Sequence, residues 1–256
     1  MNFTIITLLL AGGLFFALLA FLEVGRRIGR AVKTKEGKEA AAGSGAVDAA
    51  VYGLLGLLIA FTFSGAAARF EVRRHLIIEE ANDIGTAYLR LDMLPAEAQT
   101  ALKEKFRQYV DSRLQVYKNI ADEETARAAL ARSAALQSEI WTAAVAACKA
   151  AAPQPAAMLV LPALNQMIDI TTTRLVAMQI HPPSIVFIML IVMALLSALL
   201  AGYSMAESQS RMHMLVFAAI LAITVYVIID LEYPRQGFIR IDAADQLLQE
   251  VRQGMK

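Results

Sequence analysis

Hydrophobic residues gather in four long runs, and most polar residues lie between them. A helix needs about 20 apolar residues to cross the hydrocarbon layer of a membrane, and each run is about that long. We therefore predict four membrane spans, at residues 3–22, 47–68, 184–206 and 213–231. The first run starts without a charged residue and is followed by basic ones, which favours a retained span over a cleaved secretory signal.

The region between the second and third spans, residues 69–180, has helical periodicity and no strand-like alternation. Phe70, Ile77, Ile84 and Leu91 recur at sevens, so the second span is predicted to continue as one helix to Leu94. Pro95 should end that helix and open the next. That next helix carries one stripe, formed by Leu102, Phe106, Tyr109, Val110, Arg113 and Tyr117.

Helices are also predicted at 96–121, 122–151, 156–179 and 243–253, with a break at the APQP sequence, 152–155. Pro162 should shorten or kink the helix at 156–179. The predicted fold class is an all-α, four-span transmembrane protein with a helical extramembrane bundle between spans two and three. The expected parts are spans one and two (1–68), the bundle (69–183), spans three and four (184–231) and an interfacial segment with a short helix (232–256).

Composition supports a membrane protein, with 57% hydrophobic and 18% charged residues and a mean hydropathy of +0.51. The net charge of +1 argues against a nucleic-acid partner. Cys148 is the single cysteine and excludes an intrachain disulfide or a thiolate metal cluster. The sequence has no HExxH, GxSxG or P-loop motif, so we predict neither an enzyme nor a cofactor.

Basic residues near the span ends indicate the orientation in the membrane. The loop between the first two spans is strongly basic, whereas no Lys or Arg precedes the first span. This favours a cytoplasmic loop and places the bundle and both termini on the opposite side. Several arginines also lie on that opposite side, so the preference is small.

The stretch RRHLIIEEANDIGTAYLRLDMLP, residues 73–95, puts many polar groups on one predicted helix. Its candidate site residues are Arg73, Arg74, Glu79, Glu80, Asn82 and Asp83. Two carboxylates at i,i+4, Glu79 and Asp83, repel each other unless water, a cation or an arginine lies near them. The stretch is interpreted either as a polar network or pore mouth, or as the solvated face of a supporting helix.

Two further polar clusters lie near the later spans. Asn165, Asp169 and Thr173 form a stripe beside Arg174, which suggests a buried network, for instance Asp169 with an arginine, or a wet lumen. Asp230 ends the fourth span, where Arg235 could fold back across a proline turn to pair with it as an interfacial anchor. Asp242 is expected to cap the last helix.

Small residues at spacings of four occur on spans two and three, a pattern that allows close helix packing in membranes. They are Gly56, Ala60 and Ser64 on span two, and Ala194, Ala198 and Gly202 on span three. Packing within the chain and contacts between copies are both open interpretations.

The stretches RRHLIIEEANDIGTAYLRLDMLP, LPALNQMIDITTTR and DLEYPRQGFIR resemble the bestrophin-like domain family of bacterial membrane proteins, and FTFSGAAARFEVRRHL (61–76) is remotely similar to bestrophins, although it lacks their accompanying tryptophans. Bestrophins are pentameric anion channels whose second span lines the pore, with bulky apolar side chains at a narrow neck. The resemblance implies Ile59 and Phe63 as neck residues and a bacterial inner-membrane location. It also implies a cytoplasmic bundle, opposite to the orientation that the basic loop favours.

Two functions are compatible with these patterns. The first is an oligomeric ion channel with span two around its axis and a hydrophobic gate. The second is a non-conducting sensor or scaffold that binds a ligand or partner through the bundle. Expected partners are the lipid bilayer, further copies of the chain and inorganic ions.

Overall fold

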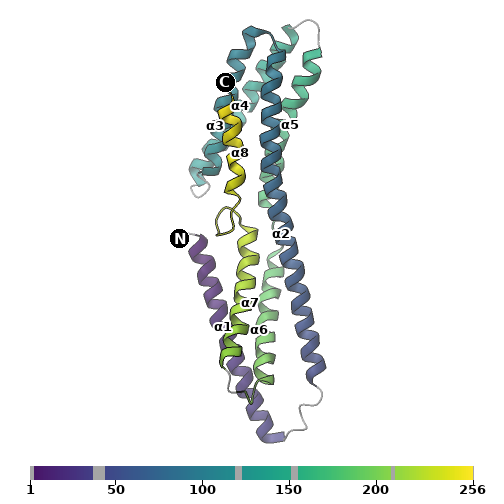
Figure 1. The fold of residues 1–256 in the computed structure, drawn as a ribbon, viewed down its shortest axis with the longest axis vertical. Helices are drawn as coiled ribbons and strands as arrows, with labels where there is room; N and C mark the ends of the chain where they lie inside the picture. The colour runs from purple at the N-terminus through teal and green to yellow at the C-terminus, as the bar shows by residue number, and fades with distance from the viewer. Residues whose placement is uncertain (1–2, 37–43, 119–122, 151–154, 209–210, 256) are drawn as a thin grey trace. The chain divides into compact units, whose positions relative to one another are not determined.

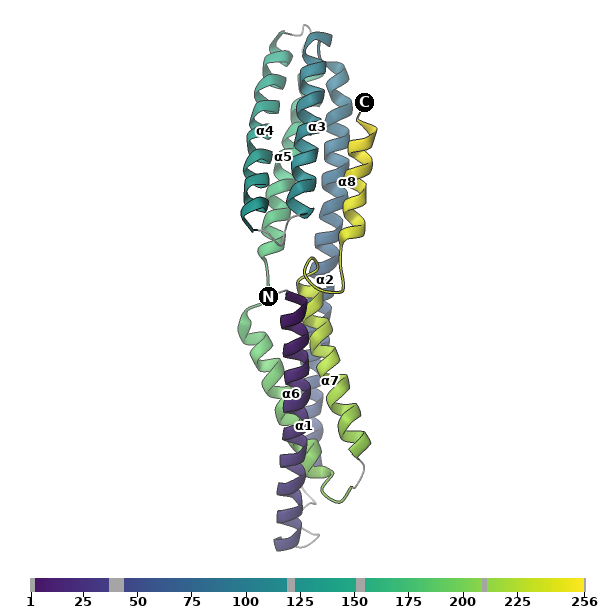
Figure 2. The same cartoon turned by 90° about the vertical axis from the view of Figure 1, so that its left-hand side faces the viewer.

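A computed structural model describes residues 3–36, 44–118, 123–150, 155–208 and 211–255. Within these ranges the chain is helical and contains no strand, which confirms the predicted fold class. The elements are α1 (Phe3–Glu36), α2 (Ser44–Arg90), the 3-10 turn η2 (Leu91–Met93), α3 (Ala96–Lys118), α4 (Glu123–Ala150), α5 (Pro155–Gln179), α6 (Ser184–Ser204), α7 (Arg211–Glu232) and α8 (Asp242–Gly254). Figures 1 and 2 show their arrangement.

Among the described residues, four helical segments are long and apolar enough to cross a membrane. They contain three of the predicted spans in full, and the third span, predicted at 184–206, extends two residues beyond its segment. The segments include α1, α2, α6 and α7. Helix α2 runs for 47 residues without a break, which confirms that the second span continues into the bundle. The chain then makes a single 3-10 turn before Pro95, whose carbonyl accepts the first hydrogen bonds of α3, from the amides of Ala98 and Gln99.

The chain divides into two compact units. Unit 1 comprises Met1–Phe70 and His181–Ile239, and unit 2 comprises Glu71–Ile180 and Arg240–Lys256. In unit 1, α1, α6 and α7 pack side by side (Figures 1 and 2). Their shared core is formed by residues such as Leu18, Leu22, Ala194, Ala198 and Ala218, all fully buried.

Glycines allow α1 and α6 to approach closely. A Cβ atom on Gly25 would overlap the carbonyl oxygen of Leu199, and one on Gly202 would overlap the carbonyl oxygen of Leu22. The predicted small residues of span three therefore pack within the chain. Those of span two do not, because Gly56, Ala60 and Ser64 are exposed.

Unit 2 has its own core between α3, α4, α5, α8 and the second half of α2. Five residues of the predicted stripe on α3 are buried, namely Leu102, Phe106, Tyr109, Val110 and Arg113, and the side chain of Tyr117 lies outside the described part of the structure. Helix α8 packs on this core through Leu248, and at the surface its Arg252 binds both carboxylate oxygens of Asp111 on α3 at 2.8 and 3.0 Å.

Two local predictions differ from the structure. Helix α5 continues through Pro162 to Gln179, so Pro162 does not shorten it, and a kink at Pro162 stays a prediction. Asp242 is the first residue of α8 and not its cap; the cap position is Ile241, and the Asp242 carboxylate pairs with Arg240 at 2.6 Å. The predicted break at 152–155 falls on residues 151–154, outside the described part of the chain, and Pro155 begins α5.

Candidate functional site

The polar residues of 73–95 divide between two faces of α2. Arg73 and Glu80 are seven residues apart, nearly two helical turns, and both are buried at 4% and 0% exposure. Arg74 and Asn82 point away from the core and are exposed, and Glu79 is half-exposed. The stretch therefore forms neither a single site nor a single solvent-exposed face. Its buried residues, Arg73 and Glu80, bind other helices of unit 2.

Glu80 is the centre of a buried ionic cluster in unit 2. Its Oε1 accepts a hydrogen bond from Arg113 Nε of α3 at 2.6 Å, and its Oε2 accepts one from Arg174 Nη1 of α5. Both arginines are themselves buried. We call these three residues the Glu80 cluster, which joins α2, α3 and α5.

The electrostatics keep Glu80 ionised. Burial by itself raises the pKa of this carboxyl, but the charges and hydrogen bonds of Arg113 and Arg174 outweigh burial and hold the pKa below its ordinary value. A carboxylate held this way does not exchange protons near neutral pH. The cluster is therefore suited to fixing three helices in one register rather than to proton transfer.

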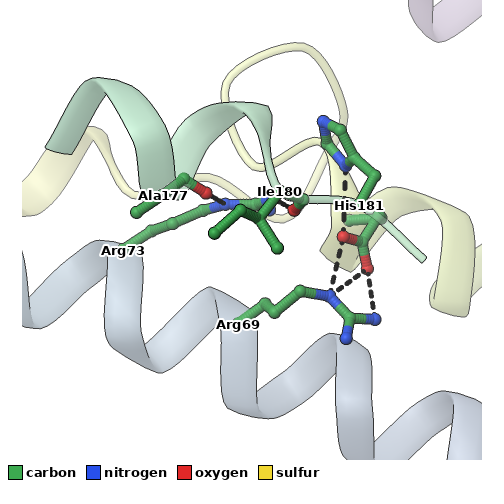
Figure 3. Close-up of polar contacts among 6 residues, drawn as sticks. Arg69, Arg73, Ala177, Ile180 and His181 are labelled. Atoms are coloured by element: carbon green, nitrogen blue, oxygen red, sulfur yellow. Dashed lines mark hydrogen bonds and ion pairs between the residues drawn. The ribbon is translucent and has the colours of Figure 1, made fainter. Parts of the chain in front are cut away.

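Arg73 fixes the end of α5. Its Nε donates to the carbonyl of Ala177 at 3.0 Å, and its Nη2 donates to the carbonyl of Ile180 at 2.9 Å (Figure 3). The last carbonyls of a helix have no partner within the helix, and a cation there also complements the helix dipole. Arg73 therefore has a structural partner within unit 2.

The outward candidates form local contacts along α2. Arg74 pairs with Glu71 at 2.9 Å, and His75 Nε2 lies 3.5 Å from Glu79. Asp83 is half-buried, and its pKa is raised by burial and then by the nearby charges of Glu79 and Glu80. These contacts are typical of a solvated helix face.

The predicted buried network on α5 is wrong for Asn165 and Asp169. The two side chains do meet, since Asn165 Nδ2 donates to Asp169 Oδ2 at 3.0 Å, but both are exposed in the single chain. Arg174 is the residue of this helix that turns inward, and its carboxylate partner is Glu80. That Asn165 and Asp169 line a water-filled lumen stays a prediction.

A second buried carboxylate, Glu232, lies at the end of α7 in unit 1. Arg69 Nε donates to Glu232 Oε1 at 2.8 Å, and Arg69 Nη2 donates to Oε2 at 2.9 Å, a bidentate pair (Figure 3). His181 Nδ1 lies 3.2 Å from the same Oε1 (Figure 3). The His181 ring stacks on Tyr233 at a centroid distance of 4.8 Å, so this acid ties α2 to the segment that precedes α6.

Asp230 is fully buried and organises the loop after α7. Its carboxylate accepts hydrogen bonds from the amides of Phe238 at 3.1 Å and Ile239 at 2.7 Å, and from the Tyr226 hydroxyl at 3.2 Å. A Cβ atom on Gly237 would overlap this carboxylate, so any larger residue at 237 would displace the Asp230 side chain from its partners. Arg235 is also buried, and its pairing with Asp230 as an interfacial anchor stays a prediction.

One face of α2 carries small or polar residues at six positions and large apolar residues at Leu57 and Leu89. The six are Gly53, Ala60, Ser64, Glu71, His75 and Asn82, all of them exposed. Their offsets of 7, 11, 18, 22 and 29 residues keep them on one side of a helix with 3.6 residues per turn. We call this set the α2 polar face.

The two predicted neck residues differ in their surroundings. Ile59 is half-buried and packs against the core of unit 1, whereas Phe63 is 44% exposed. Leu57, which the sequence did not single out, is 52% exposed and lies seven residues before Ser64 on the α2 polar face.

Sequence reasoning missed Arg113, Glu232 and His181 as parts of ionic clusters. A signal for Arg113 was present, because an arginine within a stripe of buried residues must meet a carboxylate. Glu232 also had a signal, as an acid in the last turn of a span. His181 had none, since its partner lies on α7, far away in the sequence.

In the part of the chain that the structure describes, no three His, Cys, Asp or Glu side chains are grouped to hold a metal ion. The comparison with curated proteins and the comparison with solved structures returned no match. The model of the bestrophin-like domain matches residues 8–245. With four described segments long and apolar enough to cross a membrane and a match over nearly all of its length, this integral membrane protein belongs to the bestrophin-like domain family.

Proposed function

We propose that this protein is an oligomeric ion channel in which the α2 polar face borders the conduction path. Membership of a bestrophin-like family supports a channel. The observation that carries the proposal is the α2 polar face itself, because small and polar side chains leave room for water along an uninterrupted helix.

The exposure of α2 supports contacts with further copies. Only 6% of its most apolar stretch is buried within the chain, compared with 17% for α1 and 44% for α7. Helices that face lipid carry large apolar side chains, whereas small residues mark helix contacts and pore linings. Gly53, Ala60 and Ser64 on the uncovered side of α2 therefore favour neighbouring copies or a pore over lipid.

A homo-oligomer is required by this arrangement, since one helix cannot enclose a path. The flank of the polar face carries Leu54 and Phe61, both strongly exposed in the single chain. In a ring of subunits, such bulky apolar flanks would pack against the adjacent copy while the polar face turns to the axis.

A hydrophobic constriction would gate the path by excluding water. Phe63 and Leu57 are the side chains that we assign to it, because both are exposed and bulky. Ile59 would contribute only if it left its packing against the core of unit 1. Asn165 and Asp169 are proposed to border the wider mouth, as exposed polar residues of α5.

The proposal is tested by current measurements on single-cysteine variants. The native cysteine is first removed by Cys148→Ala, and Ser64→Cys is then introduced in that background. In planar bilayers, a charged water-soluble thiol reagent should change the current of the Ser64→Cys protein, because the new thiol faces water. The matched control is Leu9→Cys, exposed on α1, where lipid contact should prevent modification.

Neck variants provide the second arm of this experiment. Phe63→Ala and Leu57→Ala should raise the open probability, because a smaller side chain weakens the dewetted barrier. Absence of current from the purified oligomer, with Phe63→Ala also silent, would contradict the channel and leave the sensor or scaffold hypothesis.

A further inference from the structure

A charged pocket lies between α1 and α7 in unit 1, at the end of these spans that carries the basic loop. It has a cavity volume of about 540 Å³, and three arginines line it, Arg26, Arg27 and Arg211. Leu19, Met214 and Leu215 line it as well. The pocket thus combines a cationic part with an apolar part.

The cationic part has an excess of positive charge. Glu23 is the one acid in the lining, and it pairs with Arg26 Nη2 at 2.6 Å and with Arg27 Nε at 3.0 Å. Three guanidinium groups and one carboxylate give this lining a net charge of +2 (3 − 1). Helix α7 begins at Arg211, so the positive end of its dipole is at the same place.

Arg26 supplies a separate indication of a ligand. Its side chain is 12% exposed, and its buried Nε donates to no acceptor in the described part of the chain. A buried donor without an acceptor costs free energy, and native structures normally satisfy it. An oxygen atom of a bound anion would accept the hydrogen bond that Arg26 Nε can donate.

The apolar part continues into the membrane region. Leu19 belongs to the predicted span 3–22, and Met214 and Leu215 belong to the predicted span 213–231. Leu215 is 48% exposed, so the groove between α1 and α7 is open toward the lipid. The charged part lies at the span ends, where phospholipid headgroups are found.

We propose that this pocket binds one anionic phospholipid. Its phosphate would accept hydrogen bonds from Arg26 and Arg211, and an acyl chain would lie along Leu19 and Leu215. A headgroup with a net negative charge is favoured over a zwitterionic one, because a choline ammonium would meet the positive charge of the lining. The site is independent of whether the protein conducts ions.

Native mass spectrometry of the full-length protein in detergent tests the site. The protein is incubated with equal amounts of phosphatidylglycerol and phosphatidylcholine, and the bound lipid is counted. Phosphatidylglycerol should be retained preferentially, and Arg26→Gln should reduce its retention by about fivefold. The matched control is Arg74→Gln, which breaks an exposed pair with Glu71 at the same i,i+3 spacing and should change nothing.

A second variant, expected to bind more lipid, distinguishes loss of the site from misfolding. Glu23→Gln removes the competing carboxylate and should increase phosphatidylglycerol retention. Excess inorganic phosphate should not displace the lipid, because phosphate lacks the acyl chain. Equal retention of the two lipids, or unchanged retention in both Arg26→Gln and Glu23→Gln, would overturn the proposal. Displacement by phosphate alone would replace it with a free-anion site.

Discussion

At the scale of single residues, two adjacent acids on α2 have opposite roles. Glu80 is fully buried between Arg113 and Arg174, while Glu79 is half-exposed beside His75. Breaking a buried ion pair leaves uncompensated charge in the core, whereas a surface pair contributes little. The stability of unit 2 should therefore depend on Glu80 and hardly on Glu79.

We predict that Glu80→Gln lowers the free energy of unfolding of unit 2 by about 3–5 kcal/mol. The reason is that two buried guanidinium groups lose their carboxylate. Thermal unfolding in detergent measures this effect through the fluorescence of Trp141, the single tryptophan, which packs against the core of unit 2. Glu79→Gln is the control and should change the stability by less than about 1 kcal/mol. Equal stability of the two variants would contradict a structural role for the cluster.

The same cluster predicts a dependence on pH. The folded-state pKa of Glu80 lies below its ordinary value of 4.5, so its stabilisation is complete above that value and is lost as the pH falls through the folded-state pKa. The difference in melting temperature between wild type and Glu80→Gln should therefore be constant at neutral pH and shrink in acid. A difference that grew on acidification would show that the pKa is raised instead.

The sequence alone could locate these polar residues but could not assign their partners. Periodicity placed Arg113 in a stripe that packs inward, and the stretch 73–83 was recognised as exceptional. Which acid turns inward depends on a rotation of about 100° per residue. Asp169 was expected to meet an arginine in a buried network, yet Asp169 is exposed, whereas Arg174 of the same helix is buried.

At the scale of helices, glycines in similar small-residue patterns have different surroundings. Gly202 lets α6 contact the backbone of α1, whereas Gly56 has open space around it in the single chain. The spacing of small residues indicates that a helix can be approached closely, but not by which partner. The length of α2 was easier to predict, because a seven-residue repeat of large apolar residues runs through it.

We predict that Gly202→Val lowers the yield and the melting temperature of the folded protein, because its side chain would overlap the Leu22 carbonyl. Gly56→Val should leave the fold of the single chain intact and weaken the oligomer. Light scattering coupled to size-exclusion chromatography separates the two effects. A stable oligomer of Gly56→Val would argue against contacts between copies at this face of α2.

At the scale of the whole molecule, the two units alternate along the chain. The chain passes from one unit to the other after Phe70, Ile180 and Ile239. Each unit therefore contains residues that are remote in sequence, such as Leu248 of α8 in the core with Phe106. The sequence predicted the helices of both units but not which core α8 joins, because the apolar face of a helix does not identify the surface that it covers.

We predict that the bundle faces the periplasm, as the basic loop favours. Ser138→Cys on α4 and Met212→Cys on α7, each in a Cys148→Ala background, are both exposed and allow labelling. In intact cells a membrane-impermeant thiol reagent should modify Ser138→Cys and spare Met212→Cys. The reverse pattern would establish the orientation that the bestrophin resemblance implies.

The glycine contact between α1 and α6 also has a consequence for biosynthesis. The first helix leaves the ribosome long before the helix against which its glycines fit, since Gly25 meets Leu199. During translation, α1 therefore stays in the bilayer or beside the insertion machinery without its packing partner α6 until α2 to α5 have been synthesised. We expect nascent chains that stop before α6 to be far more sensitive to quality-control proteases than chains that extend just past it.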